Sequence, residues 1–365
     1  MAGPTAASAV PGGRARTLAQ AYRHFGEVDA AGTSPLYERV AISLSESGAA
    51  LRAVEAAPAR RRHPAAILAA LHDLALAGRA PALAAAYAAA NGDAAAAAAI
   101  DTLVRMTGSV AAIAGRRPVR TGETGRCAVL YPAIAEAARR AGADAVGLID
   151  VGCSAGLSLS VDRVGITYGN GQSLGDPSSP VQLSCLVAGG RPVPARAMPE
   201  VVARVGIDLD PVDVTDPDDT RWLRACVWPD QREQAARLAA ELALAATAPP
   251  LLLRGDAVDV LPDAFARVPA AALPVVTTTW ALSRFPREKR LRFLDRLGDA
   301  AAGRAVAWVS AEGVGVAPAM PTLGDRRASG HSIIGLAELG QSALRAQAVG
   351  RCWSRGRVLA WLAGS

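Results

Sequence analysis

One stretch, residues 145–162, constrains the fold of this chain more than any other. The apolar run 145–149 is followed by Asp150, by a loop of small residues at 152–156 and then by helix-like residues at 157–162. A strand, a tight turn and a helix in this order begin a β-α-β unit. Small residues in such a turn let the backbone approach a ligand and leave helix N-terminal amides facing it. We therefore expect an α/β domain with a ligand site beside Asp150.

Strand-like and helix-like segments alternate along the rest of the C-terminal part. The strand patterns lie at 201–209, 251–253, 274–279 and 305–309, and helix patterns between them lie at 232–246 and 287–297. Alternation of this kind predicts a Rossmann-like, doubly wound, mostly parallel sheet with helices on both faces. Residues 343–349 and 357–362 are expected to form a C-terminal antiparallel hairpin at the sheet edge. The predicted fold class is therefore α/β.

The first 120 residues have a different pattern. Residues 1–18 are rich in Pro and Gly without hydrophobic periodicity, which predicts a disordered tail. Residues 19–120 show apolar residues at helical spacing and no clear strand, which predicts an all-helical lobe acting as a lid and substrate wall. The α/β domain is expected over 121–365, with the Gly-, Pro- and Ser-rich segment 168–194 as an insertion that shapes the substrate pocket.

Composition excludes several classes of protein. Hydrophobic residues make up 51% of the chain, but charged residues interrupt every apolar run before it reaches membrane-spanning length. The net charge of +6 is scattered without interleaved aromatic residues, so we expect no nucleic-acid partner. Four histidines and five cysteines without metal-ligand spacing predict no metal site. No signal sequence is indicated, so we expect a cytoplasmic protein with no membrane attachment; the oligomeric state is not indicated.

Carboxylates follow three of the predicted strands. Asp150 ends the first strand, Asp208 and Asp210 end the second, and Asp256 follows the third. In an open parallel sheet the ligand lies outside the carboxyl ends of the strands, where the strand order reverses. A carboxylate there can accept hydrogen bonds from both hydroxyls of a ribose, or from an adenine amino group. These residues therefore predict a nucleoside-containing ligand.

The same motifs resemble those of class I S-adenosylmethionine-dependent methyltransferases. They are Asp-x-Gly-x-x-x-Gly at 150–156, Gly-Ile-Asp-Leu-Asp-Pro at 206–211 and Gly-Asp-Ala at 255–257. The resemblance implies that S-adenosylmethionine is the cofactor. It implies that Asp208 or Asp210 holds the ribose and Asp256 the adenine. The methionine portion is then held by the strand end and its loop, that is, by Asp150, Gly152, Ser154 and Gly156.

A closer resemblance is to an actinobacterial family known as domain of unknown function two-three-three-two. It rests on residues 148–159, 162–163, 175–180, 208–213 and 227–231, and it extends from about Ser34 to the C-terminus. The chain departs from the expected patterns at two places. Ser154 stands where methyltransferases usually have the middle glycine, and Thr277, Thr278 and Thr279 stand where a histidine is expected in this family.

The predicted reaction is methyl transfer to a small-molecule acceptor. Positioning of a nucleophile provides much of the rate of such a reaction, so few acid or base residues are required. The candidates on the substrate side are Trp280, Tyr168, Asp230 and Glu312, of which Glu312 or Asp230 would act as the base for an oxygen nucleophile. Glu123 and Arg126 either form a salt bridge or close over the methionine end of the cofactor.

Other functions are also consistent with these residues. Gly-x-Ser-x-Gly at 152–156 matches the nucleophile turn of α/β-hydrolases, and Ser154, Asp256 and His331 come in hydrolase order. A non-catalytic scaffold that kept the sheet is a further alternative, because Ser154 would crowd the cofactor. A nicotinamide dinucleotide is less favoured, because the loop lacks the Gly-x-Gly-x-x-Gly spacing.

Overall fold

The computed structural model describes residues 17–120, 125–340 and 343–363, which form two compact units. One unit combines Met1–Gly122 with Asp216–Ala239, and the other combines Glu123–Thr215 with Ala240–Ser365. We call them the helical unit and the α/β unit. The sequence placed 216–239 in the α/β domain, whereas the structure groups this segment with the N-terminal helices. The predicted tail lies outside the described residues except for its last two, of which Thr17 caps the first helix.

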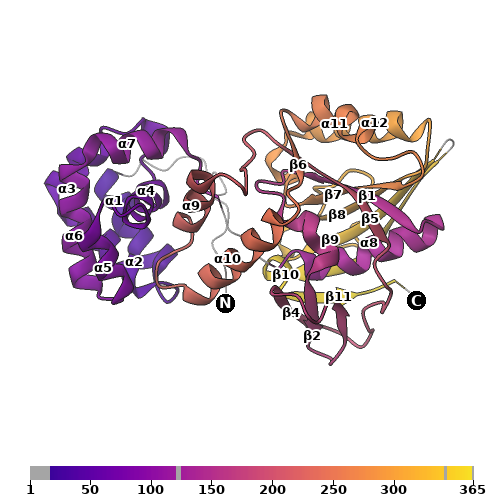
Figure 1. Ribbon diagram of the computed structural model, residues 1–365, viewed down its shortest axis with the longest axis horizontal. Helices are drawn as coiled ribbons and strands as arrows, with labels where there is room; N and C mark the ends of the chain where they lie inside the picture. The colour runs from indigo at the N-terminus through magenta and orange to yellow at the C-terminus, as the bar shows by residue number, and fades with distance from the viewer. Residues whose placement is uncertain (1–16, 121–124, 341–342, 364–365) are drawn as a thin grey trace. The chain divides into compact units, whose positions relative to one another are not determined.

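The helical unit contains helices and no strand among its described residues. Proline occupies the first turn of four of them, where a missing amide hydrogen has no cost. The elements are α1 (Leu18–His24), η1 (Phe25–Ala30), α2 (Pro35–Glu46), α3 (Gly48–Val54), η2 (Ala59–Arg61), α4 (Pro64–Leu76), α5 (Pro81–Ala88), α6 (Gly92–Arg105), α7 (Thr107–Arg116), α9 (Pro217–Ala225) and the first half of α10 (Arg232–Ala246) (Figure 1).

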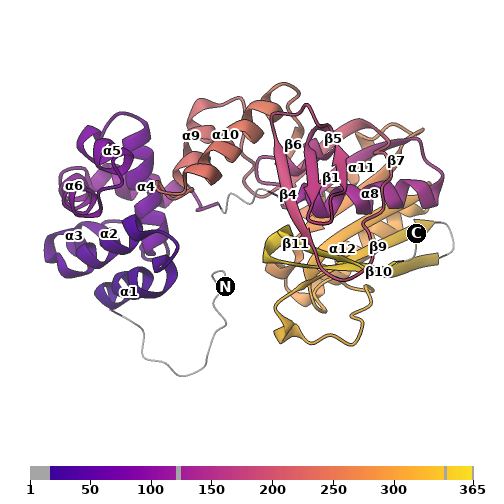
Figure 2. The same cartoon turned by 90° about the horizontal axis from the view of Figure 1, so that it is seen from below.

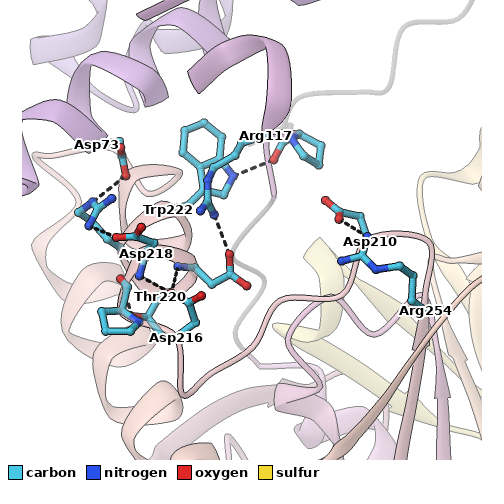
Figure 3. Close-up of polar contacts among 12 residues, drawn as sticks. Asp73, Arg117, Asp210, Asp216, Asp218, Thr220, Trp222 and Arg254 are labelled. Carbon is cyan, nitrogen blue, oxygen red and sulfur yellow. Dashed lines mark hydrogen bonds and ion pairs between the residues drawn. The ribbon is translucent and has the colours of Figure 1, made fainter. Parts of the chain in front are cut away.

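Polar contacts explain why the segment 216–239 belongs with these helices. The indole of Trp222 on α9 is buried and donates to the carbonyl of Pro118 at 2.9 Å (Figure 3). Asp73 on α4 accepts from Arg221 at 3.0 Å, and Asp219 accepts from Arg117 at 2.8 Å. Sequence periodicity contains no signal for such pairing between distant segments, so the domain boundary could not be predicted there.

The α/β unit is built on one sheet with strand order β3-β2-β4-β11-β10-β9-β8-β7-β1-β5-β6. Its strands are β1 (Ala145–Val151), β2 (Gly165–Tyr168), β3 (Ser173–Gly175), β4 (Gln182–Val187), β5 (Glu200–Asp208), β6 (Leu251–Arg254), β7 (Leu273–Thr279), β8 (Val306–Gly313), β9 (Ser332–Gly340), β10 (Ala343–Trp353) and β11 (Val358–Trp361). Its helices are α8 (Cys127–Ala141), η3 (Leu157–Arg163), the end of α10, α11 (Ala257–Ala266), η4 (Leu282–Arg284), α12 (Arg287–Ala301), η5 (Arg327–Ser329) and η6 (Ser354–Gly356).

The half of the sheet from β6 to β8 is parallel and doubly wound. After β1 the chain forms β2, β3 and β4 at the opposite edge of the sheet. It then forms β5 and β6 on one side of β1 and returns to β7 on the other side. The strand order therefore reverses between β1 and β7. Apolar residues of α8 pack on one face of this half, and those of α11 and α12 pack on the other (Figure 1). The predicted α/β fold with a mostly parallel sheet is confirmed.

The other half of the sheet is larger than predicted. The predicted hairpin of β10 and β11 is present, but β9 joins it to β8 in an antiparallel meander (Figure 2). It does not lie at the edge, because β4 pairs with β11 and β2 with β4. The predicted insertion 168–194 is thus part of the sheet. β2 and β3 are short and β9 is buried without alternation, so periodicity does not reveal these three strands, whereas β4 does alternate in burial.

Within the described residues, no single helix has the length and apolar composition that crossing a membrane requires. Two pairs, α4 with α5 and α6 with α7, meet that criterion only when taken together, and each pair is sharply bent.

Candidate functional site

The carboxyl ends of β1 and β7 form the centre of the candidate site. Asp150 on β1 lies opposite Thr277 on β7, and its Oδ1 accepts a hydrogen bond from the Thr277 hydroxyl at 2.7 Å. The side chain is buried, and its Oδ2 has no hydrogen-bond partner among the described residues. Burial raises the pKa of Asp150 to about 6, although the Thr277 bond and the charge of Arg126 act in the opposite direction. A buried acceptor without a donor is costly, which marks this atom as unusual.

The loop after β1 adopts left-handed backbone conformations. Gly152 has φ +73°, Gly156 has φ +69° and Ser154 has φ +54°, although side-chain-bearing residues rarely adopt such values. A Cβ atom added at Gly152 would lie 3.0 Å from the Cβ of Ala281. Gly152 therefore lets the loop after β1 pack against the loop after β7, which is a structural reason for the glycine besides approach to a ligand.

Asp208, at the end of β5, accepts hydrogen bonds that hold the loop after β1 in place. Its Oδ2 accepts from the amide of Ser154 and its Oδ1 from the amide of Asp210, both at 2.9 Å, and the side chain is buried. A carboxylate oxygen can accept more than one hydrogen bond, so these two amide bonds do not by themselves exclude a bond from a ribose hydroxyl. The geometry gives Ser154 a definite role, because its left-handed conformation aims its amide at Asp208.

Asp210 and Asp256 lie two residues beyond the ends of β5 and β6, each with a cationic partner. Asp210 is half exposed and pairs with Arg254 at 2.7 Å (Figure 3). Asp256 begins α11, where its Oδ1 accepts from the amide of Val258 at 3.0 Å and its Oδ2 pairs with the ammonium of Lys289. Burial raises the pKa of Asp256, but Lys289 and Val258 outweigh it, so the net shift is downward.

Arg126 and Trp280 complete the α8 side of the site. Trp280 follows β7 with φ +54°, and its indole N–H donates to the Ser332 hydroxyl at 2.8 Å. Arg126, at the start of α8, donates from Nη1 to the Thr279 hydroxyl at 3.1 Å, and its guanidinium carbon lies 5.5 Å from the centroid of the Trp280 ring. Glu123, considered with Arg126 above, lies outside the described residues.

Glu312 lies at the end of β8 and holds the loop that carries Trp280. Its Oε1 accepts from the amides of Ala281 at 2.9 Å and Leu282 at 3.0 Å, while its buried Oε2 has no partner among the described residues. Burial raises the pKa of Glu312 to about 7 against these amide bonds. By strand alternation it shares the sheet face of Trp308, in the core of α11 and α12, whereas Asp150 faces α8. This places Glu312 as a positioning residue.

Two of the predicted substrate-side residues have structural roles elsewhere. Tyr168 is buried on β2, and its hydroxyl donates to the carbonyl of Ala128 at 2.7 Å. Asp230 belongs to the helical unit, where it accepts from the Ser34 hydroxyl at 2.6 Å and from the amide of Leu36, beside the start of α2. Sequence reasoning chose both for their chemistry alone, and it missed Ser332 because no motif surrounds that residue.

The contacts of the predicted hydrolase residues do not form a Ser–His–Asp relay among the described residues. His331 Nε2 lies 2.9 Å from Asp325, which also binds Arg351, and Asp256 is paired with Lys289. A cleft of about 460 Å³ lies instead at the amino end of β5, lined by residues that include Asp162, Asp176 and Glu200. No group of three or more potential metal-ligating side chains occurs in the described part of the chain.

Comparison with known proteins identifies a family. A family model described as an uncharacterized protein conserved in bacteria, DUF2332, matches residues 19–361. No curated protein and no solved structure matches the chain. The actinobacterial origin implied by the sequence resemblance stays a prediction. Because the family model spans both units and nearly the whole chain, this protein belongs to the bacterial family DUF2332.

Proposed function

We propose that the protein is an S-adenosylmethionine-dependent methyltransferase that acts on a small molecule. The observation that carries the proposal is the buried Oδ2 of Asp150, which has no donor among the described residues although it lies where the strand order reverses. An α-ammonium group would supply that donor. Ligands of open parallel sheets bind at this reversal point, so the position of Asp150 agrees with the chemistry of the atom.

The other residues support the proposal to different degrees. Two amides hold Asp208 in place at the end of β5, and its carboxylate is of the type that accepts hydrogen bonds from ribose hydroxyls. Asp210 is half exposed and would have to exchange Arg254 for a hydroxyl. Asp256 already accepts from Lys289 and Val258, so its proposed bond to the adenine amino group would be additional. We therefore propose Asp150 and Asp208 as the principal cofactor residues.

When bound, S-adenosylmethionine supplies an electrophilic methyl group. The residues of the chain position the reactants: Asp150 anchors one end of the ligand, and Trp280 forms a wall whose orientation is set by Glu312 and Ser332. Methyl transfer depends mainly on this alignment, since in-line geometry lowers the entropic barrier without a dedicated acid. Cytoplasmic location and a small-molecule acceptor belong to the same proposal.

Calorimetric titration of the full chain with S-adenosylmethionine tests this proposal. Asp150→Asn keeps the size of the side chain but removes its charge, and we expect it to weaken binding at least tenfold, because charge-assisted hydrogen bonds are worth about 1.5–3 kcal/mol. Asp176→Asn is the matched control, because Asp176 lies in a turn at the other end of the sheet and bonds to Ser178. Absence of binding to the wild-type chain would contradict the proposal and favour a scaffold.

A further inference from the structure

Three groups beside Arg126 together have the chemistry of a cation site. The Oδ2 of Asp150 offers an anionic acceptor, Thr279 offers a hydroxyl and a carbonyl oxygen, and Trp280 offers the face of an indole ring. Carboxylates attract cations by charge, and an indole face attracts them through its quadrupole. We call Asp150, Thr279 and Trp280 the cation corner.

The cation corner is held in shape before any ligand arrives. Trp280 adopts a left-handed backbone conformation that tryptophan rarely takes, and such strain persists only where the surroundings impose it. Glu312 binds the two amides that follow Trp280, and Ser332 fixes the indole N–H. Asp150 is fixed in turn by Thr277. The ring and the carboxylate are therefore oriented by contacts that do not involve Arg126.

Arg126 contacts some groups of the cation corner but makes no hydrogen bond to the Asp150 Oδ2. Its guanidinium contacts Thr279 and the indole face, and its charge lowers the pKa of Asp150, yet no hydrogen bond reaches the Asp150 Oδ2 from any described residue. A guanidinium is broad and planar, whereas an ammonium or sulfonium is a compact charge. The guanidinium of Arg126 lies over the indole face, and its charge acts on Asp150, so we infer that a compact cation in its place would interact with both groups.

We propose that the guanidinium of Arg126 is a displaceable occupant of the cation corner, and that a ligand carrying a compact onium group binds by replacing it. This inference rests on the proposed function and extends it, because S-adenosylmethionine carries both an ammonium and a sulfonium group. The same displacement of Arg126 would apply to any ligand with an onium group. Arg126 then competes with the ligand, so removal of its charge strengthens binding of such a ligand.

Small cations test this inference independently of S-adenosylmethionine. The indole N–H signal of Trp280 is followed by NMR in the full chain, assigned with Trp280→Phe, during titration with methylammonium chloride and with trimethylsulfonium chloride. Sodium chloride at equal ionic strength is the reference. We expect a saturable shift of this signal in the wild-type chain, about tenfold tighter binding in Arg126→Gln, in line with the range of cation–π energies, and loss of the shift in Asp150→Asn.

Two further variants control for altered folding. Arg126→Lys keeps a positive charge at the same position, and because its ammonium is itself a compact cation, it is expected to bind the probes no more tightly than the wild-type chain. Arg139→Gln makes the same substitution at the far end of α8, where the side chain is half exposed, and is expected to leave binding of the probes unchanged. Binding that is unchanged or weaker in Arg126→Gln overturns the inference, and so does an indole signal that responds equally to sodium chloride.

The outcomes separate this inference from the proposed function. Probe binding that tightens in Arg126→Gln, with no binding of S-adenosylmethionine, supports the cation corner and contradicts the methyltransferase. Binding of S-adenosylmethionine that depends on Asp150 but does not tighten in Arg126→Gln supports the methyltransferase and overturns the displacement of Arg126.

Discussion

Two buried glutamates of the α/β unit are stabilised in opposite ways. Glu136 on α8 accepts hydrogen bonds from Arg139, Arg140 and Arg196 at 2.8 to 3.1 Å, so both of its oxygens have cationic partners. Glu312 at the end of β8 binds two backbone amides through one oxygen, and its other oxygen has no partner among the described residues.

The pKa values follow this difference. Hydrogen bonds and charge from Arg139, and then from Arg140, lower the pKa of Glu136 to about 2 despite its burial, whereas burial raises the pKa of Glu312 to about 7. Asp150 resembles Glu312, with a pKa raised to about 6. The Glu136 charge, which has a structural role, is paired within the chain, while Asp150 and Glu312, at the ends of β1 and β8, each keep an oxygen without a donor among the described residues. This contrast locates the candidate site better than any motif.

The largest effect is expected from breaking the Glu136 cluster. Glu136→Gln leaves three guanidinium groups without their carboxylate, and we expect the free energy of unfolding at pH 7 to fall by about 3–4 kcal/mol. Because the pKa of Glu136 is lowered on folding, its contribution is present above pH 4.5 and is lost as the pH falls toward about 2. Urea unfolding at pH 7 and pH 3 measures this loss. A decrease below 1 kcal/mol at pH 7 would show that the cluster is not structural.

Glu312→Gln is expected to change the free energy of unfolding less than Glu136→Gln does, and with the opposite dependence on pH. Because the pKa of Glu312 is raised on folding, the wild-type chain loses stability as the pH rises from about 4.5 to about 7. The glutamine keeps an oxygen for the two amides but does not ionise. We expect the variant to gain roughly 2–3 kcal/mol relative to the wild-type chain between pH 4.5 and pH 8. Urea unfolding of both chains across this pH range measures the difference. If the free energy of unfolding changed with pH equally in the two chains, Glu312 would not differ from Glu136 in the way described.

Arg139→Gln should have the smallest effect. Its guanidinium is half exposed, and Glu136 retains Arg140 and Arg196 when Arg139 is removed. We expect a decrease of about 0.5 kcal/mol in the free energy of unfolding, as for other solvent-exposed ion pairs, and a weaker effect still at high salt. Urea unfolding at low and high ionic strength checks both. A decrease comparable to that of Glu136→Gln would mean that the arginines do not act as a shared set.

The sequence predicted the parallel half of the sheet well, because its strands and helices differ clearly in period and length. The strand predicted at 201–209 is β5 (Glu200–Asp208), and that at 274–279 is β7 (Leu273–Thr279). Residues 157–162, predicted to be helix-like, lie in the 3-10 helix η3. Residues 216–239 belong to the helical unit because of contacts such as that of Trp222 with Pro118. No pattern in the neighbouring sequence predicts such contacts.

The candidate site was predicted only where position along a strand determines it. Asp150, Asp208 and Asp256 follow strands whose carboxyl ends must share one edge of a parallel sheet, so spacing alone brings them there. Tyr168 and Asp230 were chosen by residue type, and the structure gives each a buried or capping partner. The sequence marked Thr277 only as a replacement for an expected histidine, and no motif marked Ser332, because the importance of both lies in the strand register and in one hydrogen bond each.

A pH titration of the Asp150 carboxyl group tests the central claim most directly. The signal of its side-chain carbon is followed by ¹³C NMR, assigned with Asp150→Asn, in the absence and presence of S-adenosylmethionine. The account predicts a pKa of about 6 in the free chain, which falls when the ligand is bound, because a cation beside the carboxylate favours its ionised form. A pKa that is the same with and without the ligand would contradict the assignment of Asp150 to the ligand site.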